Sequence, residues 1–204
     1  MPTILAVSGS PSLPSFTHEV LALACAPLTA RGLRVDTLAL RELPARALLA
    51  ADGGDPAVAD AVARLEAADA VVLATPVYKA AYSGLLKTFL DLLPQHALAG
   101  KVVLPLATGG SMAHALALDY GLRPVLMSMA PAAVANAVFV HAESALRDPE
   151  GLRGLEPDTR TRLDQAAEGF ADLLDALALH ALLNEAVTDD LVTAERLAGL
   201  RQAA

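Results

Sequence analysis

Short, strongly hydrophobic runs alternate along this chain with longer segments in which hydrophobic residues recur every three or four positions. A short apolar run is typical of a buried strand, and a spacing of three to four is typical of a helix with one buried face. The pattern predicts strands at Thr3–Val7, Leu33–Leu40, Ala70–Ala74, Lys101–Ala107 and Ala133–Val140. It predicts helices at Ser15–Arg31, Pro56–Ala67, Ser83–Leu93, Met112–Ser128 and Asp158–His180.

Strand and helix alternate five times, which indicates an α/β fold: a doubly wound, five-stranded parallel sheet with helices on both faces. Ala70–Ala74 is apolar at every position, so we expect it at the centre of the sheet, and the partly polar Leu33–Leu40 nearer an edge. A single domain is expected over residues 1–180, followed by a tail or a short docked helix at 181–204. Glu143–Pro157 is rich in charge, Gly and Pro, and is expected to be a loop.

Composition and charge exclude several classes of protein. The chain carries 23 acidic and 15 basic residues, a formal net charge of −8, and only 3% aromatic residues. Such a chain repels a phosphate backbone and offers little surface for base stacking, so we expect no nucleic-acid partner. No apolar run approaches the roughly 18 residues that span a bilayer, and the N-terminus lacks the features of a signal peptide. We therefore expect a cytoplasmic protein with no membrane partner. The lone Cys25 forms no internal disulfide, and no Cys or His cluster has the spacing of a metal site.

Three loops follow the carboxyl ends of predicted strands, where open α/β sheets bind their ligands. The first, Ser8–His18, places hydroxyl groups just before a helix, whose free N–H groups and dipole favour a phosphate. The candidate phosphate-binding residues are Ser10, Ser15, Thr17 and His18. The loop matches neither the G-x-G-x-x-G fingerprint nor the P-loop, which disfavours an adenine nucleotide held in those ways. The alternative is structural: Ser15 or Thr17 caps the helix, and the other Ser and Pro residues form turns.

The second and third loops offer a site for a flat polar ring. Their candidate residues are an aromatic and cationic group, Pro76, Val77, Tyr78 and Lys79, and a glycine-containing group, Thr108, Gly109, Gly110 and Ser111. The glycines permit close approach of the backbone to a planar ligand. Tyr82 and His114 stand near the starts of the following helices and are candidate pocket or interface residues. Ordinary alternatives stay open: Lys79 as a solvated lysine, Tyr82 in helix-end packing, and His114 in local hydrogen bonding.

The sequence around these loops resembles the NAD(P)H-dependent FMN reductase family. The resemblance is carried by Ala74–Gly84, Lys87–Pro94 and Gly100–Gly110, and beyond them by His114, Asp119-Tyr120 and Pro124–Leu126. It extends over about Thr3 to Leu179. Within the family, the chain is most similar to the FMN reductases of two-component alkanesulfonate monooxygenase systems.

The resemblance implies a flavodoxin-like sheet of order 2-1-3-4-5. It implies that the phosphate of FMN binds at Ser10–Thr17 and that the isoalloxazine lies against Pro76–Tyr78 and Thr108–Ser111. Relatives transfer hydride from NADPH or NADH to FMN and release reduced flavin to a partner monooxygenase, which uses it with O₂ to remove sulfite from an alkanesulfonate. The resemblance also implies a homo-oligomer, a dimer or tetramer, in which an irregular, π-like turn at Tyr120 faces a subunit interface near the flavin. The apolar helices Ser83–Leu93 and Met112–Ser128 would supply its contact faces.

Two other functions stay open from the sequence: a self-contained quinone, azo or metal-ion reductase that keeps its FMN, and a flavodoxin-type electron carrier. We assign no catalytic residue, because hydride transfer to a flavin is the chemistry of the cofactor itself. The choice between NADPH and NADH stays open as well, since no basic cluster for a 2′-phosphate stands out.

One departure from the family concerns the phosphate loop. Related reductases place an arginine after Gly-Ser-Pro and often another a few residues later, where this chain has Ser12 and Phe16. No Lys or Arg precedes Arg31. We therefore predict a phosphate held by hydroxyls, backbone N–H groups and His18, and weaker FMN retention than in arginine-bearing relatives. Ser12→Arg is expected to raise the affinity for FMN, and an unchanged affinity would contradict this prediction.

Overall fold

A mostly parallel sheet forms the centre of the computed structural model, which describes the backbone of residues 2–202 and the side chains of residues 2–184. Its main strands are β1 (Thr3–Ser8), β2 (Arg34–Ala39), β3 (Ala70–Tyr78), β5 (Val102–Gly109), β6 (Ala133–Val134) and β7 (Val138–His141). They pair in the order β2-β1-β3-β5-β6. The start of β5 pairs with β6, and the end of β5 pairs with β7. This is the flavodoxin-like order that the family resemblance implies.

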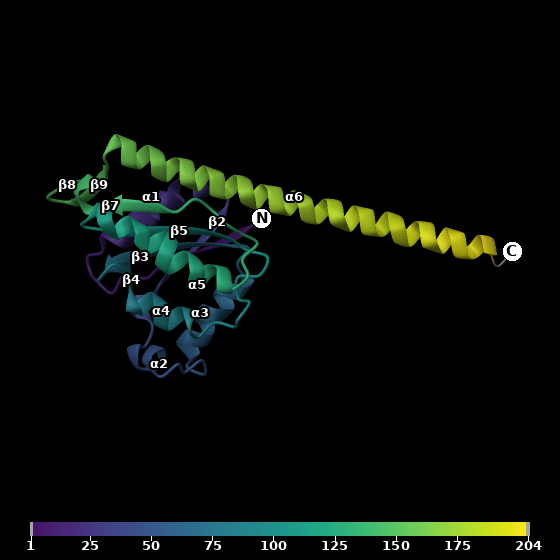
Figure 1. Ribbon diagram of the computed structural model, residues 1–204, viewed down its shortest axis with the longest axis horizontal. Helices are drawn as coiled ribbons and strands as arrows, with labels where there is room; N and C mark the ends of the chain where they lie inside the picture. Colours follow the sequence, from purple (N-terminus) through teal and green to yellow (C-terminus); the bar gives the residue numbers. More distant parts are fainter. Residues whose placement is uncertain (1, 203–204) are drawn as a thin grey trace.

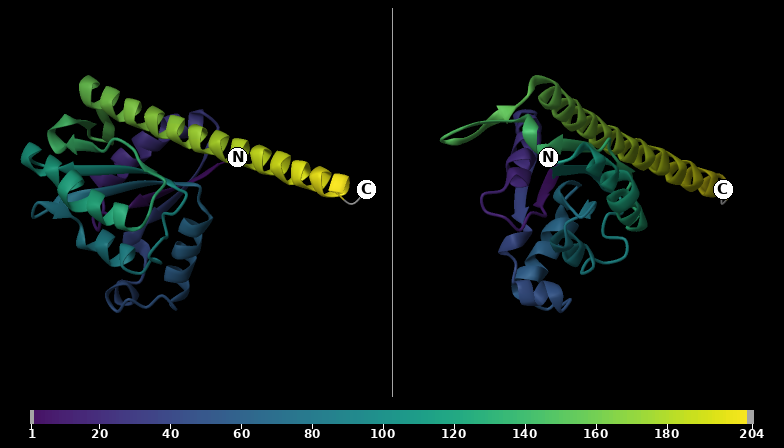
Figure 2. Two further views of the ribbon diagram at one scale, coloured as in Figure 1. Left: turned by 45° about the vertical axis from the view of Figure 1, so that its right-hand side comes forward. Right: turned by 60° about the vertical axis from the view of Figure 1, so that its left-hand side comes forward.

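Helices cover both faces of the sheet (Figures 1 and 2). On one face lie α1 (Phe16–Ala30) and the first part of α6 (Pro157–Gln202), and on the other α3 (Pro56–Ala67), α4 (Gly84–Leu90) and α5 (Arg123–Ser128). A 3₁₀ turn (η1, Leu40–Glu42) and the short α2 (Ala45–Leu49) connect β2 to α3.

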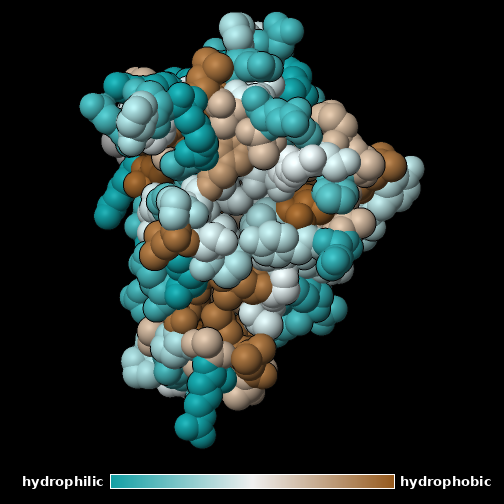
Figure 3. Space-filling view, turned by 90° about the vertical axis from the view of Figure 1, so that its left-hand side faces the viewer, coloured by the Kyte–Doolittle hydropathy of each residue, from teal (hydrophilic) through white to brown (hydrophobic). Residues whose placement is uncertain are grey.

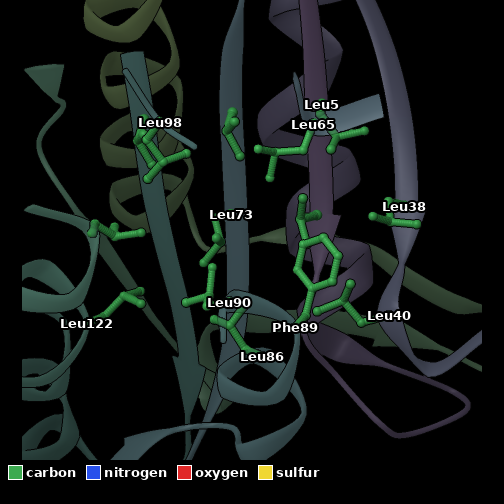
Figure 4. Close-up of a cluster of buried hydrophobic side chains, with 14 of the residues drawn as sticks. Leu5, Leu38, Leu40, Leu65, Leu73, Leu86, Phe89, Leu90, Leu98 and Leu122 are labelled. Carbon is green, nitrogen blue, oxygen red and sulfur yellow. The ribbon is translucent and has the colours of Figure 1, made fainter. Parts of the chain in front are cut away.

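The hydrophobic core has one layer on each side of the sheet. Figure 4 shows the layer in which Leu5 and Leu73 of the sheet pack beside Leu65 of α3 and Phe89 of α4. The opposite layer joins the sheet to α1 and α6, and Phe170 of α6 is fully buried in it. Two covered faces explain why β3 is apolar along nearly its whole length.

Four predicted elements differ from the structure. Glu143–Pro157 is not a loop but contains an antiparallel hairpin of β8 (Ala145–Asp148) and β9 (Gly151–Leu155). Its turn is stabilised by Asp148, whose Oδ1 accepts hydrogen bonds from the N–H groups of Glu150 and Gly151. Gly, Pro and charged residues thus mark a tight turn here, flanked by strands too short to show a clear alternation.

Met112–Ser128 is not one continuous α-helix. It consists of a 3₁₀ turn (η2, Met112–Ala115), a π-helix (η3, Ala117–Leu122) and α5. The predicted strand Ala133–Val140 is likewise split into β6 and β7, although both pieces pair with β5. The irregular turn that the family resemblance implies around Tyr120 is therefore present.

The last helix is longer than the sequence pattern predicts. α6 continues without a break from Pro157 to Gln202, so residues 181–202, expected to form a tail or a short docked helix, are the end of α6. Figure 1 shows this end projecting beyond the domain. Buried side chains in α6 extend to Leu174, whereas Leu179, Leu182 and Leu183 are exposed.

Candidate functional site

The three candidate loops meet at one edge of the sheet. β1, β3 and β5 are parallel neighbours, so their carboxyl ends lie side by side, at the left of Figure 1. Figure 3 faces this edge, where hydrophilic and hydrophobic side chains surround a centre of intermediate hydropathy. The sequence prediction that these loops form one site therefore agrees with their placement.

Buried hydrogen bonds connect the three loops to one another. The N–H of Gly9 donates to the Ala74 carbonyl at 2.7 Å, and the Ser83 hydroxyl donates to the Gly9 carbonyl at 2.6 Å. The hydroxyls of Thr17 and Thr108 share a hydrogen bond of 2.7 Å. These contacts fix the first loop against the second and third without any ligand.

The first loop combines buried hydroxyls with free N–H groups at the start of a helix, a chemistry that suits an anion. Ser10, Ser15 and Thr17 are only 3%, 6% and 3% exposed. Ser15 caps α1, because its Oγ accepts a hydrogen bond from the His18 N–H at 3.2 Å. The N–H groups of Phe16 and Thr17 precede the first intrahelical hydrogen bond, which Glu19 donates to the Ser15 carbonyl, and have no partner within the helix. Capping and anion binding are thus compatible here, since Ser15 satisfies one of the free N–H groups and leaves others for a ligand.

The second loop presents backbone in a strained conformation. β3 turns into the two-residue strand β4 (Ala81–Tyr82) through Lys79 and Ala80, whose φ angles are 51° and 61°. Two successive positive φ angles match a type I′ turn, which normally carries Asn and Gly. Strained backbone of this kind is concentrated at ligand sites. Tyr78, at the start of the turn, is 48% exposed.

The third loop combines a tightly packed glycine with an open one. A β-carbon at Gly109 would lie 3.0 Å from Cζ of Phe139 and 3.6 Å from Nδ1 of His114. A β-carbon at Gly110 would meet no atom within 4 Å. Ser111 is the residue before η2, and its Oγ accepts a hydrogen bond from the Ala113 N–H. The loop therefore leaves free space directly over the Gly110 backbone.

The remaining candidates from the sequence are Tyr82, Tyr120, His18 and His114. The Tyr82 ring packs beside Gly121 of the π-helix, since a β-carbon there would lie 3.7 Å from Tyr82 Cδ1. Tyr120 is 79% exposed on the same π-helix. Nδ1 of His18 and Nδ1 of His114 are buried and have no hydrogen-bond partner among the described residues.

The structure adds two groups that sequence reasoning missed. Ser83 is the cap of α4, and its hydroxyl joins the second loop to the first; its place before a helix was the available signal. Arg147 of the hairpin lies with Cζ 5.5 Å from the centre of the Phe16 ring and Nη2 2.8 Å from Oε2 of Glu19. No local pattern reveals Arg147, because it is 128 positions from Glu19 in the chain.

Elsewhere in the described part of the molecule, the features are less suited to binding a ligand. A cavity of about 550 Å³ lies at the opposite edge of the sheet, between Pro2, Asp69, Lys101 and Leu177. The Lys101 ammonium there already donates to two backbone carbonyls. Within the described residues, no cluster of three His, Cys, Asp or Glu side chains suits a metal, and no helix has the length and hydrophobicity to cross a membrane.

Comparisons with known proteins agree with this geometry. Residues 2–146 match the family described as NADPH-dependent FMN reductase. The chain is 43% identical to the FMN reductase (NADPH) of Escherichia coli K12 over 167 residues, 82% of this chain and 87% of the relative. It is 40% identical to the NADH-dependent FMN reductase SfnF of Pseudomonas putida over 127 residues, 60% of this chain and 68% of the relative. The crystal structure of the NADH:FMN oxidoreductase EmoB in its apo form superposes with a TM-score of 0.76 and 43% identity, covering 83% of this chain and 88% of that chain.

Proposed function

Because this chain belongs to the NADPH-dependent FMN reductase family, and is an oxidoreductase that uses FMN and NAD(P)H, we propose that it supplies reduced FMN to a separate flavin-dependent monooxygenase. The partner favoured by the sequence resemblance is a cytoplasmic alkanesulfonate monooxygenase. The observation that supports release of the flavin is the openness of the site proposed for its ring, where there is free space over Gly110 and Tyr78 is half-exposed. A ring bound there reaches solvent without movement of the core.

The residues present fit FMN. Buried hydroxyls and free N–H groups at the start of α1 suit its phosphate, and the open backbone of the second and third loops suits its ring. The residues that we propose to hold it are Ser10, Ser15, Thr17 and His18 for the phosphate, and Pro76, Val77, Tyr78, Lys79, Thr108, Gly109, Gly110 and Ser111 for the ring.

FMN, when bound, supplies the hydride-accepting ring, and the protein supplies orientation and electrostatics. The hydrogen bonds of Gly9, Ser83, Thr17 and Thr108 hold the loops in place before the ligand arrives. Backbone N–H groups near Tyr78, Lys79 or Gly110 would be the donors to negative charge on a reduced ring, as fixed donors are in an oxyanion hole.

We also propose a homo-oligomer in which Tyr82, Tyr120 and His114 lie at or near a subunit contact. Large hydrophobic side chains are exposed along this segment: Met112 of η2 is 59% exposed, Leu116 between η2 and η3 61%, and Met127 of α5 55%. Several large apolar side chains exposed on one segment favour an interface there. Light scattering after gel filtration measures the mass; a monomer at micromolar concentration would contradict this part of the proposal.

The decisive experiment is anaerobic oxidation of NADPH and of NADH by the purified protein, first with substoichiometric and then with excess FMN. Consumption that follows added FMN mole for mole supports FMN as a released substrate. A protein that retains its flavin and turns over only with a quinone would instead be a self-contained reductase. Failure to oxidise either nucleotide would favour an electron carrier.

A pair of variants connects this activity to the ring site. Gly110→Val adds a side chain over the third loop, where its β-carbon would meet no atom within 4 Å, so we expect lost flavin binding and an unchanged thermal unfolding temperature. Gly53→Val makes the same change where a β-carbon also meets no atom within 4 Å, and is expected to keep flavin binding. Equal flavin affinities of the two variants would place the ring elsewhere.

A further inference from the structure

The phosphate loop has a cation beside it that comes from a distant part of the chain. The Arg147 guanidinium stacks over Phe16, the first residue of α1, with Cζ 5.5 Å from the ring centre. Its Nη2 lies 2.8 Å from Oε2 of Glu19 in the first turn of the same helix. The guanidinium therefore lies against the helix end whose free N–H groups form the phosphate site.

The hairpin is built in a way that fixes this position. Its base is anchored by the buried Leu155 and by a hydrogen bond from the Glu156 N–H to the Ser144 carbonyl. The pairing of β8 with β9 shifts register between Leu146 and Arg147. Such irregularities redirect a side chain and are frequent next to functional sites.

The local chain needs this cation if it binds a phosphate. The first loop itself carries no Lys or Arg, and Glu19 places a negative charge in the first turn of α1. A flavin phosphate carries up to two negative charges near neutral pH, and a guanidinium is the side chain best matched to it.

We propose that Arg147 is the phosphate-binding cation of the FMN site, replacing in space the arginines that related reductases carry at positions 12 and 16. The inference rests on the proposed function, since it assigns the ligand phosphate to the first loop. Phe16 orients the guanidinium by cation–π stacking, and Glu19 is its counter-ion while the site holds no phosphate. The Arg147 side chain is 44% exposed, which leaves it free to turn toward a ligand.

A purely structural role makes a different prediction. If the Arg147–Glu19 pair only attaches the hairpin to α1, its loss changes the unfolding temperature and affects all flavins alike. If Arg147 binds the phosphate, its loss affects FMN and spares riboflavin, which has the same ring and no phosphate.

The test is the ratio of FMN to riboflavin affinity, measured by quenching of flavin fluorescence at low and at moderate salt. We expect Arg147→Ala to lower this ratio about tenfold, and added salt to lower the wild-type ratio more than that of the variant. Arg153→Ala is the matched control, because it removes one charge from the same hairpin, where Arg153 pairs with Asp148 and Glu150. We expect it to keep the wild-type ratio.

Two further variants keep the proposal falsifiable if Arg147→Ala loosens the hairpin. Phe16→Arg added to Arg147→Ala should restore the affinity ratio, because it returns a cation to the helix end. Glu19→Gln should raise the affinity for FMN several-fold, since it removes a competitor for Arg147 and a charge that repels phosphate. An unchanged ratio in Arg147→Ala, or equal losses for both flavins without rescue, overturns the inference and leaves the proposed function standing. Failure of the wild type to bind either flavin overturns both.

Discussion

The hydrogen bond between Thr17 and Thr108 gives the sharpest test of how the site is held together. It joins the start of α1 to the end of β5 over 2.7 Å, and the two residues are 3% and 4% exposed. Thr17→Val keeps the shape of the side chain and removes the hydroxyl. The Thr108 hydroxyl is then left buried without the partner that it has in the wild type.

The expected cost follows from that burial. Leaving a buried hydroxyl unsatisfied destabilises a protein by about 1–3 kcal/mol, whereas replacing both partners with apolar groups of the same shape is nearly neutral. Each single variant, Thr17→Val or Thr108→Val, should therefore lose about 1–3 kcal/mol. The double variant should be no less stable than either single one. For a chain of this size the single losses correspond to roughly 2–12 °C in thermal unfolding temperature.

The assay is urea unfolding of the flavin-free protein, followed by circular dichroism, for the wild type, both single variants and the double variant. Thr88→Val is the control, because its hydroxyl donates only to the Leu85 carbonyl within α4. It should combine additively with Thr108→Val. Additive losses in the Thr17 and Thr108 pair would refute the reasoning, since they would show that the two hydroxyls are not coupled.

Three further predictions concern stability and reactivity. Arg64 donates hydrogen bonds to both carboxylate oxygens of Asp36 at 2.8 Å and lowers the pKa of Asp36. The pair therefore stabilises the folded protein fully above the pKa that Asp36 has in the unfolded chain. This contribution to the free energy of unfolding is lost as pH falls through the lower pKa of the folded state. Urea midpoints should therefore depend less on pH in Asp36→Asn than in the wild type below about pH 4, and parallel profiles would contradict the pairing. Burial raises the pKa of the Cys25 thiol to about 12, so at pH 8 a disulfide reagent should react with it only in urea; rapid labelling of the native protein would show that the thiol is accessible. Phe89→Ala, at a fully buried position, should lower the free energy of unfolding in urea by about 3–5 kcal/mol. Leu49→Ala, at a position 79% exposed, should lower it by less than about 0.5 kcal/mol. Similar losses for the two variants would show that Phe89 is not a core residue.

The fold was predictable because its signals are local. A strand covered on both faces must be apolar throughout, and β3 shows this in its own residues. A helix after each strand requires parallel strands, and parallel neighbours bring their carboxyl ends to one edge. The three loops could thus be assigned to one site without coordinates.

Local irregularities were less predictable. The hydrophobic spacing of Met112–Ser128 is helical, and the family resemblance rather than the spacing indicated the π-turn that the structure contains at Ala117–Leu122. The hairpin at Ala145–Leu155 was missed because its two strands are short and its turn residues are equally common in loops.

The sequence by itself determined the alternation of strands and helices, the burial of β3 and the residue types in each loop, since each depends on neighbours along the chain; the order of the strands came from the family resemblance. Only the tertiary structure decided which of those residues touch. The Thr17–Thr108 hydrogen bond and the stacking of Arg147 on Phe16 join segments far apart in sequence. Their formation depends on how the helix, the sheet and the hairpin pack together, because a contact between distant segments has no periodicity or motif in the chain that could reveal it.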